Sequence, residues 1–85
     1  MYKINYHPQA RKFIKKINLK DAERVVQKLA QLTKNPFAQE IHAKKMTASG
    51  KTYRLRIGNI RVVYELDTKS KIIYIHDIDF RGNIY

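Results

Sequence analysis

The sequence predicts an α+β domain in which a two-helix hairpin packs on one face of a twisted, antiparallel-rich sheet. Three observations lead to this fold class. Apolar and polar residues alternate at residues 2–7 and 53–57, apolar residues recur with helical spacing between residues 10 and 32, and a continuous apolar run occupies residues 72–75. The predicted order is β-α-α-β-β-β, and the sheet face opposite the helices is expected to be basic and concave.

A half-buried first strand is predicted at residues 2–7, where tyrosine and isoleucine alternate with polar side chains. Pro8 suits the first turn of a helix, because the N–H group that proline lacks has no partner there. Asn18 separates two helical patterns, and Asn35-Pro36 ends the second. Because the link is short, the helices are expected to form an antiparallel hairpin. Their core-facing stripes are Ala10, Phe13, Ile14 and Ile17, and then Ala22, Val25, Val26, Leu29 and Leu32.

A β-hairpin is predicted from Lys51 to Asp67, after a loop at residues 36–50. Gly58-Asn59 is typical of a two-residue type II′ turn, which needs a positive φ at the glycine. This turn pairs Ile57 with Ile60, and counting outward from it fixes every later pair. The predicted core face carries Tyr53, Leu55, Ile57, Ile60, Val62 and Tyr64. The opposite face carries Arg54, Arg56, Arg61, Val63 and Glu65.

Arginines gather on that opposite face. The predicted register places Arg56 directly across from Arg61, with Arg54 on the same side. Like charges that face one another destabilise a strand pair, so an anionic ligand is expected there. A simpler interpretation stays open, because antiparallel sheets often have one solvated face.

The last strand begins with a run that is apolar on both faces, Ile72-Ile73-Tyr74-Ile75. Such a run predicts an interior strand that is buried on both sides, at least at its start. Three polar residues follow toward its far end, namely His76, Asp77 and Asp79.

Composition points to a polyanionic partner. The chain has 85 residues, which predicts a single domain spanning 1–85, and its 18 Lys and Arg against 7 Asp and Glu give a net charge of +11. The absence of cysteine excludes disulfides and thiolate metal sites, and no metal or cofactor is expected. No apolar stretch has the length of a membrane span or a signal peptide, so a cytoplasmic protein without membrane contact is expected.

The block from Tyr53 to Tyr64, the ending Arg81-Gly82-Asn83-Ile84-Tyr85 and the order of elements together resemble the RelE/ParE superfamily, the small basic toxins of type II toxin–antitoxin modules. The resemblance implies a toxin that a cognate antitoxin holds silent. In the RelE branch it implies an endoribonuclease that cleaves mRNA in the ribosomal A site and stops translation. In the ParE branch it implies a protein that inhibits DNA gyrase and cleaves no RNA. A plain RNA-binding module is a third alternative.

The resemblance to RelE-type toxins implies an active face made of Arg54, Arg56, Arg61, Arg81 and Tyr85. The implied reaction needs no metal or small-molecule cofactor, because the 2′-hydroxyl of the RNA attacks the adjacent phosphate. Arginines can bind that phosphate bidentately, and a terminal tyrosine can stack on a base. Arg61 and Arg81 are assigned to the phosphate and Tyr85 to the base. Additional substrate-binding charge is expected from Lys44, Lys45 and Lys51.

The chain departs from the best-known family member at the proton-transfer step. That member has lysines at the positions of Arg54 and Arg56, and one of them is thought to act as the general base. Arginine cannot readily take a proton at neutral pH. Glu65 and His76 are alternative bases, although Glu65 is also expected to pair with an arginine on its face. Asp79 stands where some members have a second arginine near the C-terminus, and it would repel phosphate unless it is paired.

Overall fold

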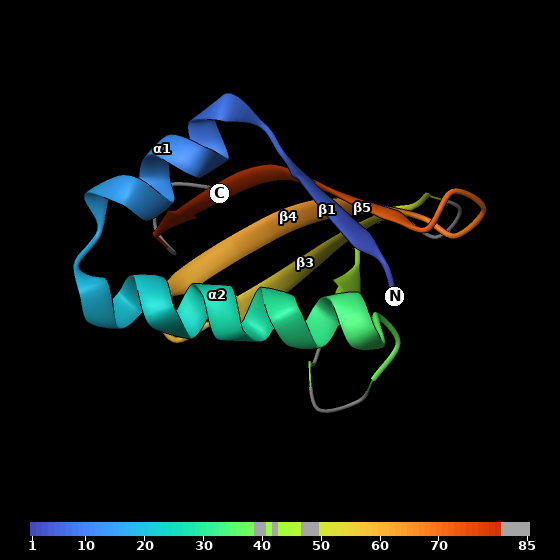
Figure 1. The fold of residues 1–85 in the computed structure, drawn as a ribbon, viewed down its shortest axis with the longest axis horizontal. Helices are drawn as coiled ribbons and strands as arrows, with labels where there is room; N and C mark the ends of the chain where they lie inside the picture. The colour runs from blue at the N-terminus through green and yellow to red at the C-terminus, as the bar shows by residue number, and fades with distance from the viewer. Residues whose placement is uncertain (39–40, 42, 47–49, 81–85) are drawn as a thin grey trace.

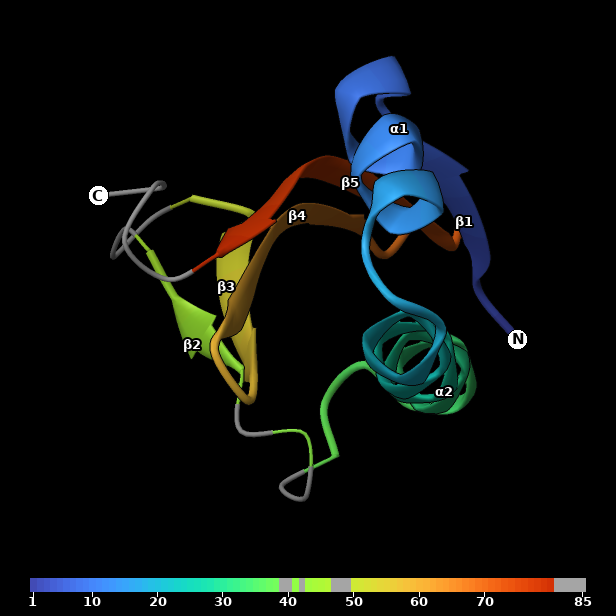
Figure 2. The ribbon, with the colours of Figure 1, turned by 90° about the vertical axis from the view of Figure 1, so that its left-hand side faces the viewer.

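The computed structural model describes residues 1–38, 41, 43–46 and 50–80 of the chain. Its five-stranded sheet has the order β1-β5-β4-β3-β2. Strand β1 is parallel to β5, and the other neighbouring strands are antiparallel. Figure 2 shows the sheet curving around α2. The elements, traced in Figure 1, are β1 (Lys3–Tyr6), α1 (Pro8–Lys16), α2 (Leu19–Lys34), β2 (Lys44–Lys45), β3 (Thr52–Ile57), β4 (Ile60–Asp67) and β5 (Ile72–Phe80). The α+β fold predicted from the sequence is confirmed.

The two helices begin and end at residues that satisfy their free backbone groups. Pro8 opens α1, and the Nδ1 atom of the preceding His7 accepts a hydrogen bond of 3.1 Å from the Gln9 N–H group. Asn18 caps α2, because its Oδ1 atom accepts a hydrogen bond of 2.9 Å from the Asp21 N–H group. Among the described residues, neither helix combines the length and the apolar content that crossing a bilayer requires.

The hairpin has the register that its turn predicts. Ile57 pairs with Ile60, and the outward pairs follow, including Arg56 with Arg61. Gly58 has φ of +60°, as the first central residue of a type II′ turn requires. The predicted core face of the hairpin is therefore confirmed: Leu55, Ile57, Ile60, Val62 and Tyr64 are buried, and Tyr53 packs against them.

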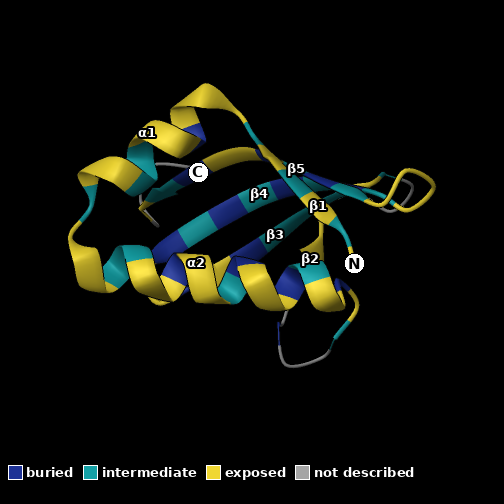
Figure 3. Cartoon of the chain, viewed as in Figure 1, coloured by how far each residue is buried: buried dark blue, intermediate teal, exposed yellow. Residues whose placement is uncertain are grey.

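The core lies between the helices and one face of the sheet, as the burial colours in Figure 3 show. Val25, Leu29 and Leu32 of α2 are all buried in it. The expectation that Val26 also faces the core is wrong, because its side chain is 51% exposed. Val26 is one residue, or about 100° of helical rotation, away from Val25. The apolar stripe that packs on the sheet is narrower than the apolar pattern in the sequence.

Two features of the sheet differ from the sequence-based expectation. Residues 44–45 form the edge strand β2 where a continuous loop was predicted, with Lys44 paired to Arg54. Strand β5 is interior, as predicted, yet Ile72 and Tyr74 are only half-buried, so the outer side of its first half is partly covered. The outer side of the sheet, away from the helices, is therefore a partly accessible surface.

Tyr64 and Tyr53 pair near the end of the β3–β4 hairpin that lies away from the turn, and their rings stack with centroids 5.6 Å apart. Burial raises the pKa of the Tyr64 hydroxyl, and the neighbouring Tyr53 raises it further. Tyr64 therefore stays neutral at physiological pH and acts as a packing residue of the core.

Candidate functional site

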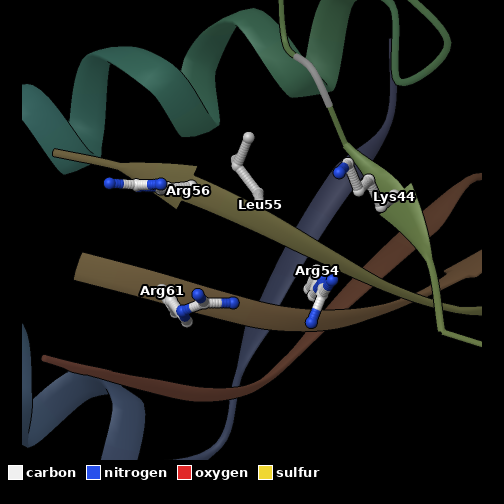
Figure 4. A pocket seen from close by; sticks show the side chains of 5 residues that line it. All are labelled: Lys44, Arg54, Leu55, Arg56 and Arg61. Carbon is white, nitrogen blue, oxygen red and sulfur yellow. The ribbon is translucent and has the colours of Figure 1, made fainter. Parts of the chain in front are cut away.

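Four cations from three neighbouring strands converge on the outer face of the sheet. Strand pairing sets Lys44 beside Arg54 and Arg56 beside Arg61. These side chains, together with Leu55, line a hollow of about 280 Å³, drawn in Figure 4 and called here the cationic hollow. Three of its residues, Arg54, Arg56 and Arg61, were predicted as catalytic, and Lys44 was predicted to bind substrate.

Among the described residues, the lining of the cationic hollow contains no carboxylate. Arg56 is held at the turn end of the hairpin, where its Nε atom donates a hydrogen bond of 3.1 Å to the Gly58 carbonyl oxygen. The Leu55 side chain points to the other side of the sheet, toward α2 (Figure 4). Guanidinium groups make charge-assisted hydrogen bonds to phosphate oxygens in a fixed fork, so this lining suits a phosphate group.

Acidic side chains border the cationic hollow on the β5 side. Strand pairing sets Asp79 directly across from Arg61, and Asp77 across from Val63. The sheet face thus changes from cationic at β2 and β3 to acidic at β5. The electrostatic repulsion expected between the Asp79 carboxylate and a phosphate is reduced, because Asp79 lies next to the positively charged Arg61.

A β-bulge brings His76 and Glu65 together on the outer face. Val63 pairs with Asp77 while Tyr64 pairs with Ile75, so His76 is an extra residue in β5. Its Nε2 atom lies 3.6 Å from Oε1 of Glu65, and both side chains are accessible to solvent. The two alternative bases named from the sequence thus form one pair.

Two of the lysines predicted to bind substrate, Lys45 and Lys51, lie away from the cationic hollow. Lys45 pairs with Tyr53, so it does not belong to the row of Lys44 and Arg54. Lys51 precedes β3 and lies near Asp67, whose pKa is lowered mainly by the Ser70 backbone N–H group. Neither Lys45 nor Lys51 lines the cationic hollow. Arg81 and Tyr85, predicted as catalytic, lie outside the described residues, so their roles stay predictions.

A second hollow of about 280 Å³, which the sequence analysis did not single out, lies where α2 meets the hairpin turn. Arg24 and Lys28 of α2 line it together with Arg56 and Gly58. The sequence does indicate that the polar residues of α2 share one helix face, because they recur every three or four positions. Only the fold shows that this face lies beside the turn.

Replacing Gly58 with alanine should lower the free energy of unfolding by about 1–3 kcal/mol, because a side chain is strained at a φ of +60°. The new Cβ atom would also lie 2.8 Å from Nη2 of Arg24. Urea denaturation of Gly58→Ala, with and without Arg24→Ala, separates the destabilisation due to backbone strain from that due to the clash with Arg24. If the Arg24→Ala background removed the whole effect, backbone strain would not be the cause.

The chain is similar to known toxins in both sequence and structure. The family model described as the ParE toxin of type II toxin–antitoxin systems matches residues 4–85. No curated protein sequence matches the chain significantly. The toxin in the RelE–RelB complex from Pyrococcus horikoshii OT3 is a structural match with a TM-score of 0.85 and 26% identity, covering 96% of this chain and 97% of that chain.

Two further solved toxin–antitoxin complexes share the fold. RelBE2 from Mycobacterium tuberculosis has a TM-score of 0.77 at 22% identity, covering 94% of this chain and 98% of that chain. The intact RelBE complex of E. coli has a TM-score of 0.76 at 18% identity, covering 94% of this chain and 96% of that chain. Because the family model spans nearly the whole chain, the protein belongs to the ParE toxin family of type II toxin–antitoxin systems, within the RelE/ParE superfamily.

Proposed function

We propose that this toxin is an endoribonuclease that cleaves mRNA in the ribosomal A site and so stops translation in the cytoplasm. The observation that carries the proposal is the cationic hollow, which is lined by Lys44, Arg54, Arg56 and Arg61, with no carboxylate in the part of the lining that the structure describes. A toxin that acts by binding a protein, without chemistry at phosphorus, has no catalytic need of a phosphate site. An enzyme that acts on a phosphodiester requires one.

The proposed reaction uses the 2′-hydroxyl of the RNA as nucleophile and needs no metal. The hydroxyl oxygen forms a bond to the adjacent phosphorus while the bond to the 5′-oxygen of the next nucleotide breaks, which leaves a 2′,3′-cyclic phosphate. A base takes the proton of the 2′-hydroxyl, and the departing 5′-oxygen takes up a proton to become a 5′-hydroxyl. Negative charge grows on the phosphoryl oxygens in the transition state. Arg61 and its neighbours in the cationic hollow would stabilise that charge and hold the strand for in-line attack.

Proton transfer is assigned to the pair of Glu65 and His76. A guanidinium group has only donors and no acceptor, so arginine does not serve as the base for the 2′-hydroxyl. Histidine side chains exchange protons in this range, and a neighbouring carboxylate orients the ring. The contact of 3.6 Å between Glu65 and His76, on the face that carries the arginines, supports this assignment.

An antitoxin is the partner implied by the family, and the similar solved structures are toxin–antitoxin complexes. The ribosome and mRNA are proposed partners in the active state. Inhibition of DNA gyrase is the second candidate function, and the observation that favours it is the match to the ParE toxin model. In that case the basic surface would bind protein, and RNA would stay intact.

Primer extension on an mRNA in a purified translation system tests the proposal. We expect cuts within codons that appear only when ribosomes and the wild-type toxin are both present. The cuts should disappear with Arg81→Ala, the family-derived phosphate ligand, and persist with Arg11→Ala, which removes the same charge from exposed α1. Intact mRNA together with blocked supercoiling in a gyrase assay would refute the endoribonuclease and select gyrase inhibition.

A further inference from the structure

We infer that the second hollow is a phosphate subsite that extends the RNA path from the cationic hollow around the hairpin turn onto α2. The subsite is formed by Arg24 and Lys28 of α2 and by Arg56 of β3. This inference rests on the proposed function, because it assumes that an RNA strand occupies the cationic hollow.

One face of α2 supplies most of the subsite. Its polar side chains recur at intervals of three and four residues, which places them side by side along the helix. With the hairpin residues they enclose a space of about 280 Å³. The lining consists of Arg24, Gln27, Lys28, Gln31, Arg56, Ile57 and Gly58.

The charge and chemistry of this lining suit a phosphate. Its described residues supply cations and amide side chains and no carboxylate. Asp21 contacts Arg24 at 3.7 Å, which is long for an ion pair, and the side chains of Arg24 and Asp21 are 51% and 22% exposed, so solvent weakens the pair. The guanidinium of Arg24 can therefore rotate toward an anion at little cost.

Gly58 lets Arg24 approach the turn closely. A Cβ atom at this position would lie 2.8 Å from Nη2 and 3.2 Å from Nη1 of Arg24. The absence of a side chain thus allows the guanidinium to lie against the hairpin turn, beside Arg56. Glycine at position 58 therefore has two roles: it adopts the φ of +60° that the turn needs, and it leaves space for the Arg24 guanidinium.

Arg56 connects the two hollows, because it lines both of them. Its Nε atom is bonded to the Gly58 carbonyl oxygen at 3.1 Å, which holds the side chain at the boundary. A strand whose phosphate sits in the cationic hollow would meet Arg56 at the hairpin end. Its next phosphates would then reach Arg24 and Lys28.

An RNA strand fits this subsite better than an acidic protein segment does. Protein interfaces are centred on a few large anchors, mostly aromatic residues and arginine, which fill well-packed and desolvated pockets. Within the described lining, Ile57 is the one apolar side chain. Cations with amide donors and continuity with the cationic hollow are instead what a run of phosphates requires.

The test measures binding of two uncleavable 2′-O-methyl RNAs, a tetranucleotide and a dodecanucleotide, by fluorescence anisotropy across a salt series. The double variant Arg24→Gln/Lys28→Gln should bind the longer RNA about tenfold more weakly, and the slope of log K against log salt should fall by about 1.4. Binding of the tetranucleotide should not change, because it is accommodated by the cationic hollow. The control Arg11→Gln/Lys12→Gln removes the same charge from α1 and should keep the wild-type slope.

Three other outcomes would each contradict the inference, for different reasons. If both double variants lower dodecanucleotide binding equally, the effect is general charge and the subsite is refuted. If Arg24→Gln/Lys28→Gln weakens antitoxin binding and leaves RNA binding intact, the hollow serves an acidic protein, and the inference is wrong. If the wild type binds neither RNA while a supercoiling assay shows gyrase inhibition, the proposed function fails and the subsite fails with it.

Discussion

Replacing Arg61 with alanine should reduce ribosome-dependent mRNA cleavage by about 10²–10³-fold, the usual cost of removing one donor that stabilises charge in a transition state. Arg61 lies on the outer face, directly across from Arg56 on one side and Asp79 on the other. Its side chain is not part of the buried core. We therefore expect the free energy of unfolding to change by no more than about 1 kcal/mol. Single-turnover primer extension and urea denaturation measure the two effects.

Two matched variants make this result specific. Arg61→Lys keeps the positive charge and loses the planar fork, so its cleavage rate should fall between those of Arg61→Ala and the wild type. Arg11→Ala removes a guanidinium from exposed α1 and should cleave normally. An Arg61→Ala protein that cleaves at the wild-type rate would remove Arg61 from the reaction. A large loss of stability in Arg61→Ala would instead mean that the aliphatic part of the Arg61 side chain stabilises the sheet by packing.

The arginine face was predictable because hairpin geometry is strongly constrained. A two-residue turn at Gly58-Asn59 fixes the pairing of Ile57 with Ile60, and side chains then alternate with a period of two. A shift of one residue would have placed the arginines in the core and Leu55 in water. The burial of Leu55 and the pairing of Arg56 with Arg61 follow from counting alone.

Other parts of the site depend on contacts between distant segments and could not be predicted. Strand β2 has only two residues, Lys44 and Lys45, so it shows no alternation, and it forms through its pairing with β3. The bulge at His76 interrupts the alternation of β5 with two consecutive polar residues, His76 and Asp77, but this pattern alone does not show which side chain meets Glu65. The hollow at Arg24 exists because α2 passes the hairpin turn.

The apolar stripe of α2 shows a third limit of sequence patterns. Val25 and Val26 are both compatible with a helical stripe, because the pattern of apolar residues is wider than the contact with the sheet. Which valine is buried depends on the rotation of α2 about its axis, and that rotation is set by packing. The structure buries Val25 completely and leaves Val26 at 51% exposure.

Replacing Leu29 with alanine should lower the free energy of unfolding by about 2–5 kcal/mol, because the buried side chain would leave a cavity between α2 and the sheet. Leu29 is 1% exposed. A domain of 85 residues has modest stability, so the melting temperature should fall by roughly 10 °C or more. Thermal denaturation followed by circular dichroism measures the change.

Val26→Ala is the matched control, since it truncates an aliphatic side chain on the same helix. Its melting temperature should stay within a few degrees of wild type, because surface substitutions usually change stability by about 0.5 kcal/mol or less. Alanine also favours the helix slightly over valine, which offsets part of the lost contact. If Val26→Ala proved as destabilising as Leu29→Ala, α2 would be rotated from the orientation described here. The Arg24 face would then turn away from Gly58, and the phosphate subsite on α2 would lose its geometric basis.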